Sequence, residues 1–280
     1  MPATVYLCDE ATALRGEAQR RALATLPAER RARAERCVHE DDRARVIIAW
    51  LLLAYGLRTA YELDAVPPLA YGERGKPYFE RATEDAALPH FNLSHSGPFA
   101  ACALAPTEVG LDVQETMGVE RHVSSAFVRR TCNISEIAWL KKAGPLGSPE
   151  HTQAFCALWT RKESVMKLTG RGLADALPRL LDLHDHDVAT STISLEGSAA
   201  REGDPAGQHA GFLSLSLWRK DVSETDESDL ACPESPTAPR NPGEGPTPGA
   251  PGDRSGVTSP GTPATFRLIR VSLDELLAGW

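Results

Sequence analysis

The stretch that decides the fold is FCALWTRKESVMKLTGRG, residues 155–172. Apolar residues recur in it at steps of three and four positions, and a Gly-Arg-Gly stop follows, which predicts one amphipathic helix. Trp159, Glu163 and Lys167 follow one another at four-residue steps and therefore share one side of that helix. A carboxylate one turn from an ammonium can hold a hard cation and a phosphate together. An ordinary Glu–Lys helix pair, worth about 0.2–0.5 kcal/mol, explains this stretch alone equally well.

Length and composition are those of a globular protein. The chain has 280 residues, 42% hydrophobic and 24% charged, which is enough for one large core or two small ones. The longest apolar run, residues 46–53, is shorter than the roughly 18 residues that a membrane span needs. The first ten residues show no basic segment followed by an apolar one, so we expect no signal peptide. We therefore expect a cytoplasmic protein without a membrane partner.

Charge is concentrated in two segments of opposite sign. Residues 221–264 contain eight acidic residues and two arginines, together with nine of the 21 prolines, within a net charge of -8 for the chain. Such a segment cannot bury enough apolar surface to offset its ordering entropy, so we expect a disordered insertion there. Residues 20–45 contain eight arginines and five acidic residues. Arg30 and Arg33 share a helix face in this segment, which indicates either a solvated surface or a phosphate clamp.

Hydrophobic patterning predicts alternating helices and strands. The predicted strands cover residues 4–8, 99–105, 108–115, 177–183, 189–195 and 211–220, and the further predicted helices cover 12–37, 43–61 and 120–142. A strand and a short helix are predicted in residues 265–277, after the insertion. We expect residues 212–218 and 265–271 to pair as a hairpin whose turn the insertion has replaced. Cys102 and Cys156 lie in apolar segments, where reduced core cysteines are expected.

Two short motifs in the first half present polar side chains where sites are commonly built. GKP, residues 75–77, is a turn that presents Lys76. FNLSHS, residues 91–96, ends a strand with alternating polar and apolar side chains. A structural, hydrogen-bonded histidine is as good an interpretation of His95 alone as a ligand contact.

A third motif, VGLDVQE, covers residues 109–115 and predicts another short strand. Asp112 and Gln114 share one face of it, because side chains alternate along a strand. A carboxylate among apolar neighbours is costly unless it is paired or binds a metal. A hydrogen bond from Asp112 to a nearby turn is the alternative explanation.

GKP, FNLSHS, VGLDVQE and WTRKESVMK thus stand in a fixed order along the chain. In this order and at these separations they resemble the motifs of the Sfp-type 4′-phosphopantetheinyl transferases, which read GKP, FNxSHS, GxDxE and WxxKE(S/A)xxK. The resemblance extends from about Glu29 to Leu277, outside the insertion.

The resemblance implies an α+β fold of two similar α/β halves related by a pseudo-twofold axis, with the active site in the cleft between them. We place the halves at residues 1–106 and 107–280. The implied enzyme transfers the phosphopantetheine arm of coenzyme A to a serine of an apo acyl or peptidyl carrier protein, releases 3′,5′-ADP and needs Mg²⁺. Secondary metabolite biosynthesis is its general setting, with the pathway open, and a monomer suffices.

The family motifs also imply roles for individual residues. Asp112, Glu163 and Gln114 match the metal positions, and Asp112, Glu163 and Lys167 are the implied catalytic residues. The implied coenzyme A contacts are Arg30, Arg33, Arg45, Lys76, Ser94, His95, Lys162 and Lys167. Glu163 is our hypothesis for the base that takes the serine proton. Glu136 matches a family glutamate in the helix before the last motif.

The sequence departs from the family at Gln114, where glutamate is usual. A glutamine carbonyl is a neutral and weaker oxygen ligand, so we expect Mg²⁺ to be held by Asp112, Glu163, the pyrophosphate and water. A Mg²⁺-dependent pyrophosphate hydrolase using the same cleft stays open as an alternative, and so does a coenzyme A-binding module without activity. Nucleic-acid binding through residues 20–45 is disfavoured, because acidic residues are interleaved there and no helix-turn-helix or zinc motif is present.

Overall fold

The computed structural model describes residues 2–73, 75–80, 88–170, 187–197, 209–222 and 264–278. Its strands are β1 (Ala3–Cys8), β2 (Leu69–Tyr71), β3 (Pro77–Phe79), β4 (His90–Ser96), β5 (Phe99–Ala105), β6 (Val109–Glu115), β7 (Val188–Glu196), β8 (Ala210–Trp218) and β9 (Phe266–Arg270). Its α-helices are α1 (Gly16–Thr25), α2 (Ala28–Glu35), α3 (Glu40–Tyr61), α4 (Ser125–Thr131), α5 (Ile134–Ala143), α6 (Pro149–Thr169) and α7 (Leu273–Ala278). Short 3-10 turns lie at Ala11–Ala13, Val119–Arg121 and Arg219–Asp221.

The mixed α+β class predicted from the sequence is confirmed by this set of elements. The predicted strand at 177–183 lies outside the described residues, and so does the predicted insertion, except for residues 221, 222 and 264. Cys102 and Cys156 are buried and free, as expected.

Two antiparallel units share one topology. In the first, β1 precedes the long helix α3 and the strands β4 and β5, and the strand order is β4-β5-β1. In the second, β6 precedes the long helix α6 and the strands β7 and β8, and the order is β7-β8-β6. Each unit is therefore a strand, a helix and two antiparallel strands, of which the last pairs with the first.

The predicted pairing of the last strand was wrong. β8 lies between β6 and β7, so both of its edges are already used. β9 instead pairs in parallel with β1, from Ala3 opposite Phe266 to Leu7 opposite Arg270. β9 thus pairs with the edge of β1 that does not pair with β5. The hairpin of residues 212–218 with 265–271 does not form, because β8 pairs with β6 and β7 on its two edges and β9 pairs with β1.

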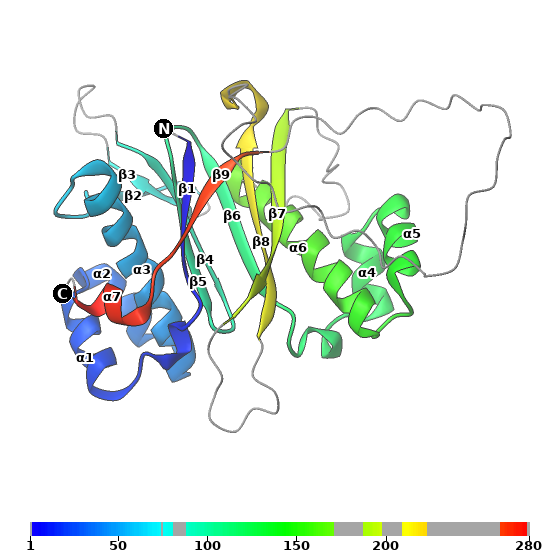
Figure 1. Cartoon of the computed structure of the whole chain (residues 1–280), viewed down its shortest axis with the longest axis horizontal. Coiled ribbons are helices and arrows are strands. Elements are labelled where there is room, and N and C mark those ends of the chain that lie inside the picture. Colours follow the sequence, from blue (N-terminus) through cyan, green and yellow to red (C-terminus); the bar gives the residue numbers. More distant parts are fainter. Residues whose placement is uncertain are drawn as a thin grey trace, which may run out of the picture.

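The first sheet is buried on both faces. Val5, Leu7 and Ala103 belong to a core that they share with leucines of β6 and β8, whereas Tyr6 and Cys102, on alternate positions of the same strands, pack under α3. Figure 1 shows α3 with α1, α2 and α7 on one side of the sheets, and α4, α5 and α6 on the other. This layering explains why β5 reads as the continuous apolar run FAACALA.

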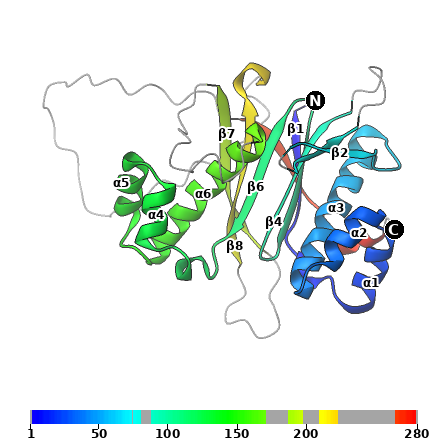
Figure 2. The ribbon, with the colours of Figure 1, turned by 180° about the vertical axis from the view of Figure 1, so that it is seen from behind.

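α3 is the core helix of the first unit and begins three residues before its predicted start. It is long and apolar enough to cross a membrane by length and composition alone, but 61% of its apolar window is buried in the fold. This burial is the behaviour of a core helix. From behind, Figure 2 shows α6 along β6 and α3 on the far side of β4, so that the two strands lie side by side between the two long helices.

Candidate functional site

The helix α6 lies on β6 at backbone contact distance. A Cβ atom built on Gly110 of β6 would be 1.9 Å from Ser164 O and 2.6 Å from Leu168 N, so a residue with a side chain does not fit there. The Ser164 hydroxyl is 2.8 Å from the Ser216 hydroxyl of β8. Glycine two positions before Asp112 therefore lets the polar side of α6 reach that carboxylate.

Asp112, Ser94 and Lys167 form the centre of the site. Lys167 Nζ lies 2.7 Å from Asp112 Oδ1 and 2.9 Å from Ser94 Oγ. Ser94 Oγ donates to the same Asp112 oxygen at 2.8 Å and accepts a hydrogen bond from Val113 N at 3.1 Å. A hydroxyl offers one donor and two acceptor positions, and all those of Ser94 are used. Ser94 therefore orients Asp112 and Lys167, and this arrangement leaves it no hydrogen bond for coenzyme A.

Two carboxylates lie close together at this centre. Desolvation raises the pKa of the buried Asp112, against the opposing effect of Lys167. Desolvation and then the negative charge of Asp112 raise the pKa of Glu163. A cation bound by both groups would relieve their repulsion.

The carboxylates of Asp112 and Glu163 are the groups at this centre that suit a divalent cation. Among the described residues, no group of three or more His, Cys, Asp or Glu side chains is arranged to hold a metal ion. Gln114 Nε2 donates to Glu115 O at 2.9 Å, so this amide is turned along its own strand. Mg²⁺ keeps several waters and commonly takes only one or two carboxylates. The pair Asp112 and Glu163 therefore fits Mg²⁺, and the predicted role of the Gln114 carbonyl oxygen stays a prediction.

Lys162 lies on the other side of α6. It is fully buried, and its Nζ lies 2.7 Å from Glu136 Oε2 of α5. That oxygen also accepts from Asn133 N at 2.7 Å and so completes the capping box of α5. Successive helix residues are rotated by about 100°, so Lys162 does not share the face of Glu163. The structure thus uses Lys162 to join α5 to α6 and does not bring it to the predicted coenzyme A site.

Trp159 was predicted to share the polar side of α6 with Glu163 and Lys167. It packs instead with Phe127 and Phe155 in a small apolar cluster between α4 and α6. Of these three residues, only Glu163 and Lys167 therefore face the cleft.

The arginines of α2 form the opposite wall. The Arg30 guanidinium lies 4.9 Å from the ring centroid of Trp50. It is buried, and its Nε and Nη2 have no hydrogen-bond partner in the part of the chain that the structure describes. Desolvation lowers the pKa of Arg30, although arginine stays charged in proteins. A buried guanidinium with free donors is suited to an anionic ligand. Arg33, one turn further on, is exposed and lines the same cavity.

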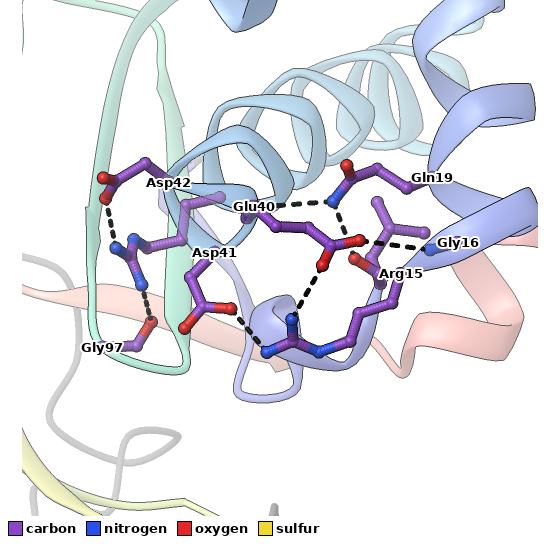
Figure 3. Close-up of polar contacts among 9 residues, drawn as sticks. Arg15, Gly16, Gln19, Glu40, Asp41, Asp42 and Gly97 are labelled. Carbon is purple, nitrogen blue, oxygen red and sulfur yellow. Dashed lines mark hydrogen bonds and ion pairs between the residues drawn. The ribbon is translucent and has the colours of Figure 1, made fainter. Parts of the chain in front are cut away.

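Arg45 is engaged by the protein itself. Its guanidinium pairs with Asp42 and donates to Gly97 O, in the turn after β4, at 3.0 Å (Figure 3). The neighbouring acids Glu40 and Asp41 bind Arg15 at 3.2 and 2.5 Å, so each acid in the first turn of α3 has a basic partner (Figure 3). Arg45 therefore fastens α3 to the end of β4, next to His95.

The His95 side chain is exposed, and it lines the cleft, whose other residues surround it. Desolvation, followed by the positive charges of Arg45 and Lys167, lowers the pKa of His95 to about 4. The imidazole is therefore neutral at pH 7. It can offer hydrogen bonds to a ligand but not a full positive charge.

Lys76 reaches from the first unit to the second. Its Nζ donates to Leu168 O at 3.2 Å, in the last turn of α6, where the helix dipole favours a cation. Desolvation lowers the pKa of Lys76. The GKP turn thus places a lysine at the end of α6, close to the cavity that both units line.

Most of the predicted residues meet in one cavity of about 350 Å³. Its lining includes Arg30, Arg33, Lys76 and His95 from the first unit and Glu163 and Lys167 from the second. Sequence reasoning included Asn92 among the polar groups of FNLSHS without giving it a role, and it missed Met166 and the arginine-stacking Trp50, because a methionine and a tryptophan in apolar runs resemble core residues. A neighbouring cavity of about 580 Å³ shares Lys76, Pro77 and Gly170 with the first, but neither Glu163 nor Lys167 lines it.

Comparisons with known proteins agree on one family. Residues 16–107 match the family model described as 4′-phosphopantetheinyl transferase, N-terminal, and residues 108–215 match the 4′-phosphopantetheinyl transferase superfamily. A 4′-phosphopantetheinyl transferase of Bacillus subtilis is 32% identical over 158 residues, which are 55% of this chain and 64% of the relative. The transferase Sfp of Bacillus subtilis strain 168 is 28% identical over 159 residues, 56% of this chain and 66% of the relative. AcpT of Salmonella typhi is 34% identical over 109 residues, 39% and 52% of the two chains. The match spans slightly less than two thirds of the first two relatives.

Proposed function

This chain belongs to the 4′-phosphopantetheinyl transferase superfamily, and on that premise we propose that it transfers the phosphopantetheine arm of coenzyme A to a serine of an apo acyl or peptidyl carrier protein. The observation that carries the proposal is the cavity in which Arg30, Arg33 and Lys76 face Glu163 and Lys167. Cations suit the phosphates of coenzyme A, and a carboxylate beside a lysine suits proton and phosphoryl transfer.

We further propose that the two units are related by a pseudo-twofold axis and that the active site is the cleft between them. The shared topology supports this, as do the similar lengths of α3 and α6, 22 and 21 residues. The division into residues 1–106 and 107–280, the cytoplasmic location and the monomeric state stay predictions.

In this proposal, residues of the first unit bind coenzyme A. Arg30 would place its free Nε and Nη2 donors on a phosphate of the nucleotide, with the exposed Arg33 beside it. Neutral His95 would donate one hydrogen bond to the same end of the molecule. Ser94 would act on the ligand only through Asp112 and Lys167, because its own hydrogen bonds are used.

The second unit carries the reaction. The carrier serine oxygen attacks the phosphorus that bears the pantetheine arm, a new O–P bond forms, and the bond to the departing 3′,5′-ADP breaks. The serine proton passes to the Glu163 carboxylate, directly or through a water molecule. Lys167, held by Asp112 and Ser94, neutralises negative charge on the departing phosphate.

Asp112 and Glu163 would hold Mg²⁺. When bound, the ion supplies neutralisation of the pyrophosphate charge. Lys167 and the Ser94 hydroxyl favour the ionised form of Asp112, which keeps this carboxylate ready for a cation in spite of its burial.

The deciding experiment is mass spectrometry of an apo-carrier domain after incubation with this protein, coenzyme A and Mg²⁺. We expect the carrier to gain one phosphopantetheine and 3′,5′-ADP to appear in equal amount, and chelation of Mg²⁺ should stop both. Nucleotide release without modification of the carrier would indicate the hydrolase. Binding of coenzyme A without either product, across several carriers, would indicate the inactive binding module.

A matched pair of variants tests the assignment of the base. Glu163→Gln removes the proposed base, and Glu150→Gln makes the same change at an exposed position in the first turn of the same helix. We expect the first variant to lose transfer and the second to keep it. Equal rates in the two variants would refute the role of Glu163.

A further inference from the structure

β4 and β6 are edge strands of two different sheets, and side-chain oxygens of β4 bridge them. Asn92 Oδ1 accepts a hydrogen bond from Leu111 N at 3.3 Å, Ser94 Oγ accepts one from Val113 N at 3.1 Å, and Ser96 Oγ accepts one from Glu115 N at 3.0 Å. Donor and acceptor are 19 residues apart in the sequence at each of these contacts. The two strands therefore run parallel in one fixed register, and the contacts form a ladder of three rungs.

The two-residue period of a β-strand explains why FNLSHS has a side chain with an acceptor oxygen at every second position. Alternate side chains of β4 point to one face, and alternate N–H groups of β6 point to its outer edge. An edge strand otherwise leaves these N–H groups unpaired, and a buried unpaired donor is costly. Asn92 and Ser94 are buried, as are Leu111 and Val113, so the first two rungs satisfy donors that water does not reach freely.

We propose that Asn92, Ser94 and Ser96 are positioning residues that set the register and the spacing of the two sheets at the active site. Direct backbone pairing of β4 with β6 would fuse the sheets into one. Rungs made of side chains hold the strands in register while keeping them a side chain apart. The cavity lined by residues of both units lies along this seam, and Asn92 is part of its lining.

The ladder acts on the reaction through Asp112. This residue stands between Leu111 and Val113, whose N–H groups are held by the first two rungs, and it shares Ser94 with Lys167. A displacement of about 1 Å between reacting groups can lower a rate by up to about a hundredfold. Loss of an outer rung is therefore expected to slow turnover although that rung touches no reacting atom. This part of the inference rests on the proposed function, whereas the ladder itself does not.

Ser96 is the best rung to remove, because it lines neither cavity. We expect Ser96→Ala to lower kcat by about tenfold with the KM for coenzyme A unchanged within about twofold. Ser96→Thr keeps the acceptor oxygen and should restore most of kcat. The matched control is Thr192→Val, which removes a hydroxyl bonded to Ser214 at 2.8 Å inside the second sheet. This control should lose a comparable amount of thermal stability and keep its kcat.

Amide hydrogen exchange tests the ladder without any assay of transfer. The amides of Leu111, Val113 and Glu115 should exchange slowly in the wild-type protein, and Ser96→Ala should speed exchange at Glu115 by about tenfold more than at Leu111. Unchanged exchange at Glu115 would overturn the ladder. An equal loss of kcat in Ser96→Ala and Thr192→Val would overturn the positioning role. A wild-type protein that modifies no carrier would overturn the proposed function, and the exchange experiment would still decide the ladder.

Discussion

α3 and α6 hold the same place in the topology of their units but bury different kinds of residue. Every residue that α3 buries is aliphatic, aromatic or glycine. α6 buries polar residues beside its apolar ones, namely His151, Thr152, Thr160, Lys162 and Ser164. Apolar packing tolerates small rotations of a helix, whereas Lys162 and Ser164 must meet Glu136 of α5 and Ser216 of β8. We interpret α3 as a scaffold helix and α6 as a helix fixed in one rotation, which a helix carrying Glu163 and Lys167 requires.

In each unit a glycine lets the long helix lie close to a strand, and the two helix–strand contacts differ in how much they can adjust. In the first unit the glycine is on the helix, and a Cβ on Gly56 would meet the Tyr6 ring at 2.6 Å. In the second unit the glycine is on the strand, and a Cβ on Gly110 would meet the backbone of α6 at 1.9 Å. A ring can shift slightly, but the backbone of a packed helix cannot, so the second contact is the stricter one.

The largest effect that we expect comes from this difference. Gly110→Ala should destabilise the protein by more than about 3 kcal/mol, because α6 must move away from β6. Gly56→Ala should cost less, about 1–3 kcal/mol, partly offset by the higher helix propensity of alanine. Urea unfolding of both variants measures the two values. A larger loss in Gly56→Ala would reverse our view of which helix is the more tightly fixed.

The next effect tests whether a buried ion pair fixes the rotation of α6. Lys162→Met should destabilise the protein by about 3–5 kcal/mol, because it leaves Glu136 charged and buried without its partner. Adding Glu136→Gln should recover most of the loss, since glutamine can keep the capping contact with Asn133. Thermal unfolding of the single and double variants measures the recovery. A double variant as unstable as the single one would contradict this account.

A smaller effect separates stability from activity on the same helix. Glu163→Gln should lower kcat by at least about a hundredfold, which is about 2.7 kcal/mol or more, while the fold becomes slightly more stable at pH 7. The pKa of Glu163 is raised in the fold, so its ionised form destabilises the native state once the pH exceeds the ordinary glutamate value. The gain in stability should therefore be absent near pH 4 and grow towards pH 7. Denaturation curves across that range would contradict the assignment if they showed the opposite trend.

The smallest expected effect is a change in the pH dependence of stability when His95 is replaced. His95 lies in β4, against which α3 packs. Its pKa is lowered to about 4 in the fold, so its protonation opposes folding as the pH falls below the ordinary histidine value of about 6.5. His95→Gln should accordingly lose less stability than the wild-type protein between pH 7 and pH 4. The difference should stay under about 1 kcal/mol, because the ring surface is open to solvent. Parallel melting curves of the two proteins at several pH values provide the measurement.

Local sequence was sufficient to predict most of the elements and the family. The periodicity of residues 155–172 predicted the face on which Glu163 and Lys167 lie, and the alternation in FNLSHS and VGLDVQE predicted their strands. These features repeat every two or three to four residues, so neighbouring residues alone determine them. The fixed order of the motifs then identified the family.

What could not be predicted depends on contacts between distant segments. The apolar pattern of residues 266–270 indicates a strand, but it does not indicate which open edge the strand will join. Lys162 stands beside Glu163 in the sequence, yet its direction is decided by Glu136 on another helix. The second role of FNLSHS, as a ladder between two sheets, became visible only when β6 was placed beside β4.

The parallel pairing of β9 with β1 bears on how the protein is made in the cell. A ribosome synthesises β1 long before residues 266–270, which pair with the edge of β1 that β5 leaves free. The nascent first sheet must therefore wait with an unpaired strand while the second unit is translated, and exposed edges of this kind recruit other strands. The sheet that is begun first is thus completed only after β6, β7 and β8 have been translated.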